Sequence, residues 1–250
     1  MDLKGKVALV TGGARGLGRA VSLLLAEEGC HVAINYISVM QQEAEETRAL
    51  VAAKGVQAIT VEGDVTDEAQ VQGMVRAVAE QLGPVDILVY SAGTTVHVPF
   101  PDLDGVSPEA WDRVMAVNVK GAFLCARAVV PMMRERGAGR IINVASSAGL
   151  TPSGSSIPYA VSKGSIIMLT KCLAKALAPD DILVNAVAPS MMRTSWWSEI
   201  PEETLRRQEQ TLPLKRAALV EDVADGIMYM IKAESLTGHT MAIDSGVSMY

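Results

Sequence analysis

The sequence predicts one α/β domain, built on a doubly wound parallel sheet of about seven strands with helices on both faces. Three observations support this prediction. Short apolar runs alternate with longer helical patterns from end to end, which is typical of βαβ units. A glycine-rich segment separates the first apolar run from the first helical pattern. The length of 250 residues suits one such domain, and no Pro- or Gly-rich linker divides the chain.

The predicted elements alternate regularly. Strands are expected at Val7–Val10, Val32–Tyr36, Ala58–Glu62, Ile87–Tyr90, Arg140–Ala145, Leu183–Ala188 and Thr240–Ile243. Helices are expected at about 16–28, 40–54, 67–82, 108–135, 157–178 and 220–232. This alternation implies a parallel sheet covered by helices on both faces, with right-handed crossovers between the strands. Segment 191–215 interrupts the alternation, and we expect an inserted loop with a short helix there.

The composition argues against several classes of protein. Lys and Arg number 22 against 28 Asp and Glu, so a net charge of −6 offers no basic surface to nucleic acid. No uninterrupted apolar run reaches the length of a membrane span, so no membrane association is expected. The three histidines lack ligand spacing, and we predict no metal site. The three cysteines form no CxxC pair, so we expect a soluble, cytoplasmic protein.

The segment Thr11–Gly18 has the features of a phosphate-binding turn. It follows an apolar strand and opens a helix, with glycines at 12, 16 and 18. Glycine at such positions permits a tight turn, close approach of the backbone to a pyrophosphate, and close packing of helix on strand. The N–H groups at the helix N-terminus favour negative phosphates. The sequence therefore predicts a Rossmann-type dinucleotide site at the carboxyl ends of the strands.

A second motif, Tyr159 with Lys163, carries groups suited to proton transfer. Residues four apart on a helix share a face, so the Lys163 ammonium would lie beside the Tyr159 phenol. A nearby positive charge lowers the pKa of a phenol, which is otherwise roughly 10 and poorly suited to neutral pH. Ser146, further upstream, could hold a substrate oxygen against this phenol, with Ser147 as its alternative. Taken alone, the pair would indicate an ordinary Tyr and Lys on an amphipathic helix.

Together and in this order, the motifs resemble those of the short-chain dehydrogenase/reductase family. The matching positions are the glycine segment 11–18, Asn118, Ser146, Tyr159 and Lys163. The resemblance runs over nearly the whole chain, from Lys6 to about Gly246. It implies hydride transfer between a nicotinamide cofactor and an alcohol/carbonyl pair, and a homotetrameric enzyme.

The resemblance also implies roles for the matched residues. Tyr159 would donate a proton to the carbonyl oxygen, and Ser146 would hydrogen-bond the same oxygen. Lys163 would lower the pKa of Tyr159 and hold the nicotinamide ribose. Asn118 would join a water-linked proton relay to Lys163, although a lone helix Asn is more often satisfied by local backbone.

The end of the second predicted strand favours NADP(H) over NAD(H). It holds Tyr36, Ile37 and Ser38 in place of the acidic residue that binds a ribose 2′-hydroxyl, so no carboxylate would repel a 2′-phosphate. Arg15 matches a position where NADP-using family members carry a basic residue. NAD(H) stays an alternative, since Ile37 stands where such members often carry a second Arg. The implied cofactor contacts are Gly12, Arg15, Gly16, Leu17, Gly18, Tyr36, Ile37, Ser38, Asp64, Val65, Ala92, Gly93, Tyr159, Lys163, Pro189, Met192 and Thr194.

Other positions near the cofactor leave alternatives open. By resemblance Asp64 contacts the adenine, whereas an Asp after a strand is often a helix cap, a role that Thr66 or Asp67 could fill instead. Tyr90 and Ser91 replace two Asn residues of the family pattern. Ser190 and Ser245 each replace a glycine of that pattern, a change expected to affect loops and assembly more than chemistry.

The substrate pocket is expected to be covered by segment 191–215 and lined mostly by apolar side chains. The residues expected there are Thr95, Val96, Leu150, Ile157, Trp196 and Trp197. They favour a small, largely apolar or aromatic ketone, or the corresponding alcohol. The two tryptophans could equally pack the covering loop down or meet a neighbouring subunit.

Three alternative functions compete with this interpretation. A 3-oxoacyl-acyl-carrier-protein reductase presents basic residues to its acidic carrier, but the matching places here hold Gly137 and Asp180, with Arg134 and Arg136 nearby. A catalytically silent dinucleotide sensor need not keep the Tyr-x-x-x-Lys motif. A methyltransferase on a similar sheet would not be expected to combine that motif with the glycine segment.

Overall fold

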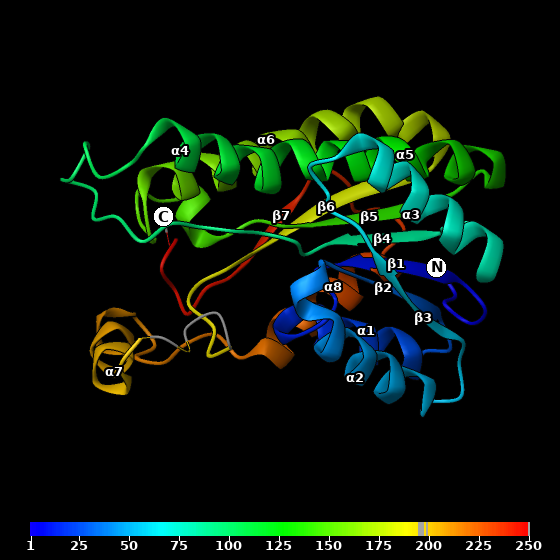
Figure 1. Ribbon diagram of the computed structural model, residues 1–250, viewed down its shortest axis with the longest axis horizontal. Coiled ribbons are helices and arrows are strands. Elements are labelled where there is room, and N and C mark those ends of the chain that lie inside the picture. Colours follow the sequence, from blue (N-terminus) through cyan, green and yellow to red (C-terminus); the bar gives the residue numbers. More distant parts are fainter. Residues whose placement is uncertain (195–197, 199, 250) are drawn as a thin grey trace.

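The computed structural model describes residues 1–194, 198 and 200–249, whose strands form one parallel sheet (Figure 1). The strands are β1 (Val7–Thr11), β2 (His31–Tyr36), β3 (Ala58–Glu62), β4 (Ile87–Tyr90), β5 (Gly139–Val144), β6 (Ile182–Pro189) and β7 (Thr240–Ile243). Their spatial order is β3-β2-β1-β4-β5-β6-β7, and every neighbouring pair is parallel. The predicted seven-stranded, doubly wound fold is confirmed.

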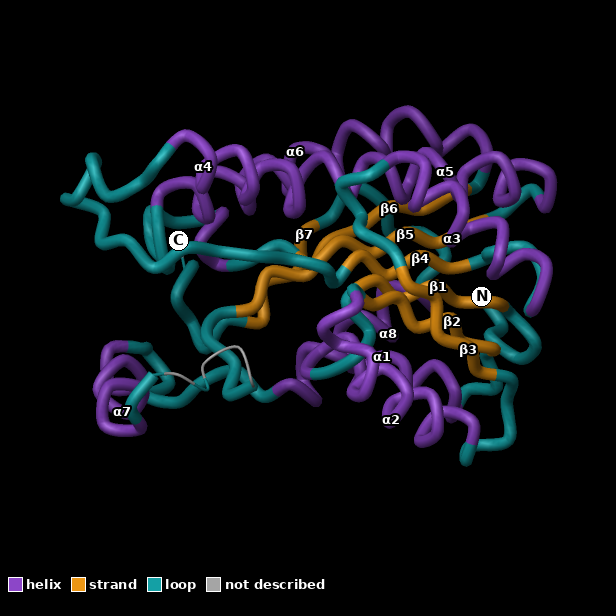
Figure 2. Tube along the Cα trace, in the orientation of Figure 1, coloured by secondary structure: helices purple, strands orange, loops and turns teal. Residues whose placement is uncertain are grey.

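The helices form a layer on each face of the sheet. They are α1 (Gly16–Glu27), α2 (Gln41–Ala52), α3 (Glu68–Gln81), α4 (Pro108–Met115), α5 (Gly121–Arg136), α6 (Ile157–Leu177), α7 (Glu202–Thr211) and α8 (Val220–Lys232). Helices α1, α2 and α8 cover one face, while α3, α5 and α6 cover the other (Figures 1 and 2). Each layer buries its own apolar cluster against the sheet.

Burial on both faces explains why the strands are apolar without alternation. All residues of β1, β4 and β6 are buried. Thr11 and Tyr90, the last residues of β1 and β4, are neighbours in the sheet. From β1 the chain moves outward to β2 and β3 before it crosses back to β4, so the connections diverge at this point. A ligand cleft is expected at such a switch point.

The predicted helix over 108–135 is continuous but changes its hydrogen-bond pattern in the middle. A π-helical turn at Ala116–Lys120, hereafter the π turn, joins α4 to α5. The span Pro108–Arg136 contains an 18-residue window with a mean hydropathy of 1.4, which is long and apolar enough to cross a membrane by length and composition alone. In the fold, 56% of that apolar window is buried inside the protein, so its apolarity is accounted for by packing in the helical layer.

Segment 191–215 contains the predicted short helix, α7, which lies beside the sheet rather than on either face (Figure 1). Arg193 attaches it to the chain that leaves β6. The guanidinium contacts Glu202 at 2.8 Å and Glu209 at 2.6 Å. Helix α7 itself buries only Leu205 among its residues. Among the described residues of this segment, α7 is thus tied to the chain after β6 by ion pairs and buries one apolar side chain.

Candidate active site

A cleft with a volume of about 860 Å³ opens at the carboxyl ends of the strands. Segments that follow β1 to β6 form its walls, together with α6 and α7. Most of the predicted site residues line it. They are Gly12, Arg15, Gly16, Leu17, Gly18, Tyr36, Ile37, Asp64, Val65, Ala92, Gly93, Ser146, Tyr159, Lys163, Pro189, Met192 and Thr194.

The glycine loop forms a cradle that side chains would fill. Gly12 and Gly16 have positive φ angles of 61° and 54°, which favour glycine. A Cβ on Gly18 would lie 2.3 Å from the carbonyl oxygen of Gly12, and one on Gly12 would lie 3.0 Å from the Cα of Ala92. A Cβ on Gly16 would extend toward Thr194, whose nearest atoms are 3.7 Å away. This close-packed backbone at the start of α1 fits the pyrophosphate of a dinucleotide.

Ser146, Tyr159 and Lys163 meet on one wall of the cleft. The Ser146 side chain lies near enough to that of Tyr159 to lower the pKa of the phenol, and its hydroxyl lies 3.4 Å from the carbonyl oxygen of Pro189. The Lys163 Nζ donates to the carbonyl of Val144 at 2.8 Å and lies 5.6 Å from the centroid of the Tyr159 ring. All three side chains are therefore fixed around the carboxyl end of β5.

Local sequence explains why α6 presents this pair to Ser146. The Ser156 hydroxyl caps the helix by accepting from the main chain of Tyr159 at 3.4 Å, and a proline follows in the first turn. The loop after β5 packs closely on the helix, because a Cβ on Gly149 would lie 2.5 Å from the carbonyl carbon of Lys163. Ser147 also lines the cleft, but the contact with Tyr159 belongs to Ser146.

Burial, and not the charge of Lys163, sets the direction in which the pKa of Tyr159 shifts in this geometry. Burial raises the pKa of Tyr159 above its usual value, and the Ser146 side chain opposes that rise only in part. Burial also lowers the pKa of Lys163 from 10.5 to about 8. The ammonium lies over the phenol ring and donates to Val144. The phenol therefore stays protonated at neutral pH, which suits a proton donor.

Asn118 lies buried in the π turn, next to the cleft rather than on its surface. Its Oδ1 accepts from the main-chain N–H of Thr94 at 2.8 Å. Its Nδ2 donates to the Thr94 carbonyl at 3.0 Å and to the Ser162 hydroxyl at 2.9 Å. The amide thus links the loop after β4 to α6 through hydrogen bonds. Tyr90 supports the same turn, because its buried hydroxyl donates to the carbonyl of Val117.

The two aspartates after β3 have separate functions. Asp67 caps α3, since its Oδ1 accepts from two main-chain N–H groups of the first turn at 2.8 and 3.1 Å. Asp64 lines the cleft instead. Partial burial alone would raise its pKa, but hydrogen bonds from Thr66 and the charge of Arg113 outweigh that effect and lower it. Asp64 is therefore a carboxylate that faces the candidate cofactor site.

Several predicted site residues do not line the cleft. Among the described residues these are Ser38, Thr95, Val96, Leu150, Ile157 and, as noted, Asn118. Leu150 is 43% exposed, and the Thr95 hydroxyl pairs with that of Ser155. The position of these residues beside a motif in the sequence did not predict where their side chains point. Trp196 and Trp197 lie outside the described residues.

Sequence reasoning missed a set of polar residues that line the cleft. They are His97, Arg113, Ser153, Ser155, Thr204, Gln208 and Thr211. They come from loops and from α4 and α7, and no motif marks them, so only the folded arrangement could have found them. In the part of the chain that the structure describes, no group of three His, Cys, Asp or Glu side chains could hold a metal ion.

The fold and the cleft define a Rossmann-type dinucleotide-binding protein. The family model described as short chain dehydrogenase matches residues 6–205. The chain therefore belongs to the short-chain dehydrogenase/reductase family of oxidoreductases, which binds a nicotinamide dinucleotide and acts on a carbonyl or an alcohol.

The similarity to relatives with assigned names extends over almost the whole chain. The ketoacyl reductase 2 assigned to the granaticin polyketide synthase of Streptomyces violaceoruber is 36% identical, with 97% of this chain and 96% of that protein covered. The 3-oxoacyl-acyl-carrier-protein reductase of Staphylococcus epidermidis is 35% identical over 98% and 99% of the two chains. A variant of actinorhodin polyketide ketoreductase, crystallised with NADPH, superposes with a TM-score of 0.90 at 30% identity and 98% coverage of both chains.

Proposed function

We propose that this protein is a cytoplasmic NADP(H)-dependent oxidoreductase that reduces a ketone, or oxidises the corresponding alcohol, on a small substrate. The observation that carries the proposal is the meeting of Ser146, Tyr159 and Lys163 on one wall of a cleft whose opposite end is the glycine cradle. A catalytically silent dinucleotide sensor would need the glycine loop to bind its ligand, but it would not need Ser146, Tyr159 and Lys163 to lie together.

The proposed chemistry divides between the cofactor and the chain. When bound, the nicotinamide would supply the hydride. Tyr159, which stays protonated at neutral pH, donates its hydroxyl proton to the carbonyl oxygen as negative charge develops there. Ser146 hydrogen-bonds the same oxygen. The Lys163 ammonium, 5.6 Å from the ring centroid, stabilises the phenolate that remains.

Asn118 enters the proposal as a support for this wall. Both polar atoms of its amide are already engaged by Thr94 and Ser162. A water-linked relay to Lys163 would therefore have to start from the main chain of the π turn rather than from the amide. The amide keeps the loop after β4, which includes Gly93, in place beside Lys163.

The rim of the cofactor end supports a preference for NADP(H). Arg15, Tyr36 and Ile37 line the cleft where the family binds the adenosine ribose, and no carboxylate stands among the residues at the end of β2. Arg15 is exposed and can turn toward a phosphate. A guanidinium offers a 2′-phosphate charge-assisted hydrogen bonds that NAD(H) would not use.

The substrate end suits a compound that carries polar groups in addition to the reacting carbonyl. Its described lining includes apolar side chains of Met191, Leu212 and Val247, as the predicted apolar substrate requires. Ser153 and Gln208 line the same region. A mixed lining favours a substrate with an apolar body and hydrogen-bonding groups.

Reduction of a 3-oxoacyl-acyl-carrier-protein is the second candidate, because relatives at about 35% identity bear that name. The surface expected to meet an acidic carrier argues against it. Arg134 contacts Asp180 at 2.8 Å, and Arg136 contacts Asp86 at 2.8 Å, so both guanidiniums are already paired with carboxylates. A small-molecule substrate therefore remains the first choice.

Absorbance at 340 nm, followed with NADPH and NADH across ketones, diketones and alcohols, tests the proposal. We expect NADPH oxidation with ketones at a higher kcat/KM than with NADH, and no activity on any carbonyl would contradict the proposal. Arg15→Ala should weaken NADPH and leave NADH nearly unchanged. The control is Arg48→Ala, which removes an exposed guanidinium paired with Glu45. Equal loss for both nucleotides would reject the 2′-phosphate assignment.

The proposed enzyme is a homotetramer. Large apolar side chains stay exposed on α5 and α6, where Phe123, Val161 and Met168 are 42%, 42% and 58% exposed. Contact between subunits would cover these side chains. Light scattering after size-exclusion chromatography should give the mass of four chains, and the mass of one chain would contradict this assembly.

A further inference from the structure

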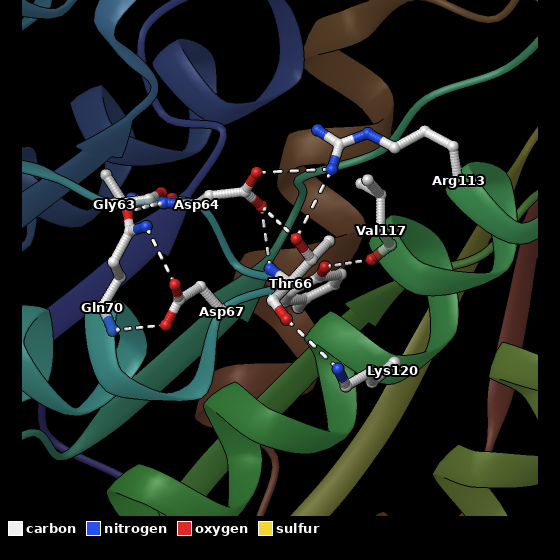
Figure 3. Close-up of polar contacts among 10 residues, drawn as sticks. Gly63, Asp64, Thr66, Asp67, Gln70, Arg113, Val117 and Lys120 are labelled. Atoms are coloured by element: carbon white, nitrogen blue, oxygen red, sulfur yellow. Dashed lines mark hydrogen bonds and ion pairs between the residues drawn. The ribbon is translucent and has the colours of Figure 1, made fainter. Parts of the chain in front are cut away.

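Arg113 is a charged residue of the cleft that the proposed chemistry does not use. It belongs to α4 and reaches toward the loop after β3 (Figure 3). Its Nη1 lies 3.3 Å from Oδ2 of Asp64 and 3.4 Å from the hydroxyl of Thr66. The same guanidinium lines the cleft and is still 52% exposed. One edge is thus engaged by the protein while the rest is accessible from the cleft.

The contacts around Arg113 fix the carboxylate of Asp64 in one orientation. Its Oδ1 accepts from the main chain and the hydroxyl of Thr66 at 2.9 and 2.8 Å, while Oδ2 accepts from Arg113. Lys120 adds a second link between the helical layer and this loop, because its Nζ donates to the Thr66 carbonyl at 3.3 Å (Figure 3). A carboxylate held at both oxygens cannot rotate without breaking one of these contacts.

The neighbours of Arg113 suit a flat ring better than a phosphate. Val65 and Val117 line the same part of the cleft, and both are largely buried. The charge of Arg113 is already shared with Asp64, which would also repel a phosphate. A guanidinium held along one edge offers its planar face, and planar cations stack favourably on aromatic rings.

We infer that Arg113 is an adenine-binding residue: its guanidinium packs on the purine ring of the bound dinucleotide, while Nη1 keeps Asp64 directed at that ring. This inference rests on the proposed function, because it requires a dinucleotide in the cleft. The inferred contact comes from α4 and the loop after β3, and so lies outside the glycine motif and the Tyr-x-x-x-Lys motif of the family.

Dissociation constants for three ligands test the inference: NADPH, 5′-AMP, which retains the adenine, and reduced nicotinamide mononucleotide, which lacks it. In Arg113→Met we expect NADPH and 5′-AMP to bind about tenfold more weakly, since a stacked guanidinium contact is lost. Binding of the mononucleotide should stay unchanged. Arg113→Lys should not restore binding, because an ammonium lacks the planar face and the fork.

The control is Arg127→Met, which breaks an exposed ion pair with Glu68 outside the cleft and should change none of the three constants. Unchanged binding of NADPH and 5′-AMP to Arg113→Met would overturn the inference. So would equal weakening of all three ligands, which indicates general disturbance, or full recovery in Arg113→Lys, which indicates charge alone. A wild-type protein that binds none of the ligands would instead contradict the proposed function.

Discussion

The two ends of the cleft are built in different ways. The proposed cofactor end consists of backbone and short side chains at the termini of buried strands, packed so closely that a Cβ on Gly18 would lie 2.3 Å from a carbonyl oxygen. The substrate end is formed by loops and by α7, which Arg193 attaches through exposed ion pairs. The first end is fixed by the core of the sheet. The second can vary without disturbing that core.

This difference separates the chemistry from the choice of substrate. Ser146 follows β5, and Lys163 bonds the last residue of the same strand, so the proposed reactive groups belong to the end that the buried strands form. Gln208 and Thr211 belong to α7. Substitutions at the two ends should therefore affect different measured quantities: cofactor affinity and kcat at one end, and substrate KM at the other.

The largest effect on cofactor affinity should follow from a change in the glycine cradle. Gly18→Ala places a Cβ 2.3 Å from the Gly12 carbonyl oxygen and 2.9 Å from the Cα of Gly13, so the loop must move. We expect NADPH to bind about 100-fold more weakly, because displacement of a binding group by about 1 Å can cost that much. Fluorescence titration measures this directly.

Gly73→Ala is the matched control for this variant. Gly73 lies within α3, and the atom nearest to an added Cβ, on Arg76, is 3.9 Å away. Its replacement should leave NADPH affinity unchanged. Equal affinity in Gly18→Ala and wild type would show that the cofactor end is less tightly packed than we describe.

A smaller effect should appear as the pH is raised. With a pKa of about 8, Lys163 is charged below that pH and loses its proton above it, so kcat/KM should fall about tenfold for each pH unit beyond 8. Stability should change in the opposite direction. Between pH 8 and 10.5 the unfolded chain binds more protons than the folded one, so the Lys163 contribution to the free energy of unfolding rises.

Kinetics and thermal unfolding measured across the same pH range separate these two effects. Activity that falls together with the melting temperature would point to unfolding. A value of kcat/KM that stays constant up to pH 10 would show that catalysis does not require the charge of Lys163.

The smallest effect is expected at the substrate end. Arg193→Ala removes the contacts to Glu202 and Glu209, and KM for the carbonyl substrate should rise about threefold, as expected for exposed ion pairs. NADPH affinity should not change. The control is Arg207→Ala, which breaks a pair with Glu203 within α7 and should leave KM unchanged. An equal loss of cofactor and substrate affinity in Arg193→Ala would contradict the separation of the two ends.

The sequence was most informative where the structure depends on local pattern. The strands lie within one residue of their predicted ends, because runs buried on both faces are apolar throughout. The glycine loop and the pair Tyr159 and Lys163 could be placed because each depends on helix or turn geometry over a few residues. The short helix in segment 191–215 could be predicted because this segment interrupts the regular alternation of strands and helices.

Contacts between distant segments could not be predicted. Arg113 and Asp64 are 49 positions apart, and Tyr90 and Val117 are 27 apart, so neither pair has a signature in sequence. Helical spacing placed Lys163 near Tyr159 but gave no information on burial, which determines the direction of both pKa changes. The side chains of Thr95 and Leu150 were expected in the cleft from their place beside motifs, and loop conformation directs them elsewhere.

The central claim is that the Tyr159 hydroxyl supplies the proton in a cleft that binds NADP(H) independently of it. The measurement that tests it most directly pairs kcat with the NADPH dissociation constant in Tyr159→Phe. We predict that kcat falls about 1,000-fold, within the range of a lost general acid, while the dissociation constant stays within about twofold of wild type. Turnover near the wild-type rate in this variant would contradict the claim.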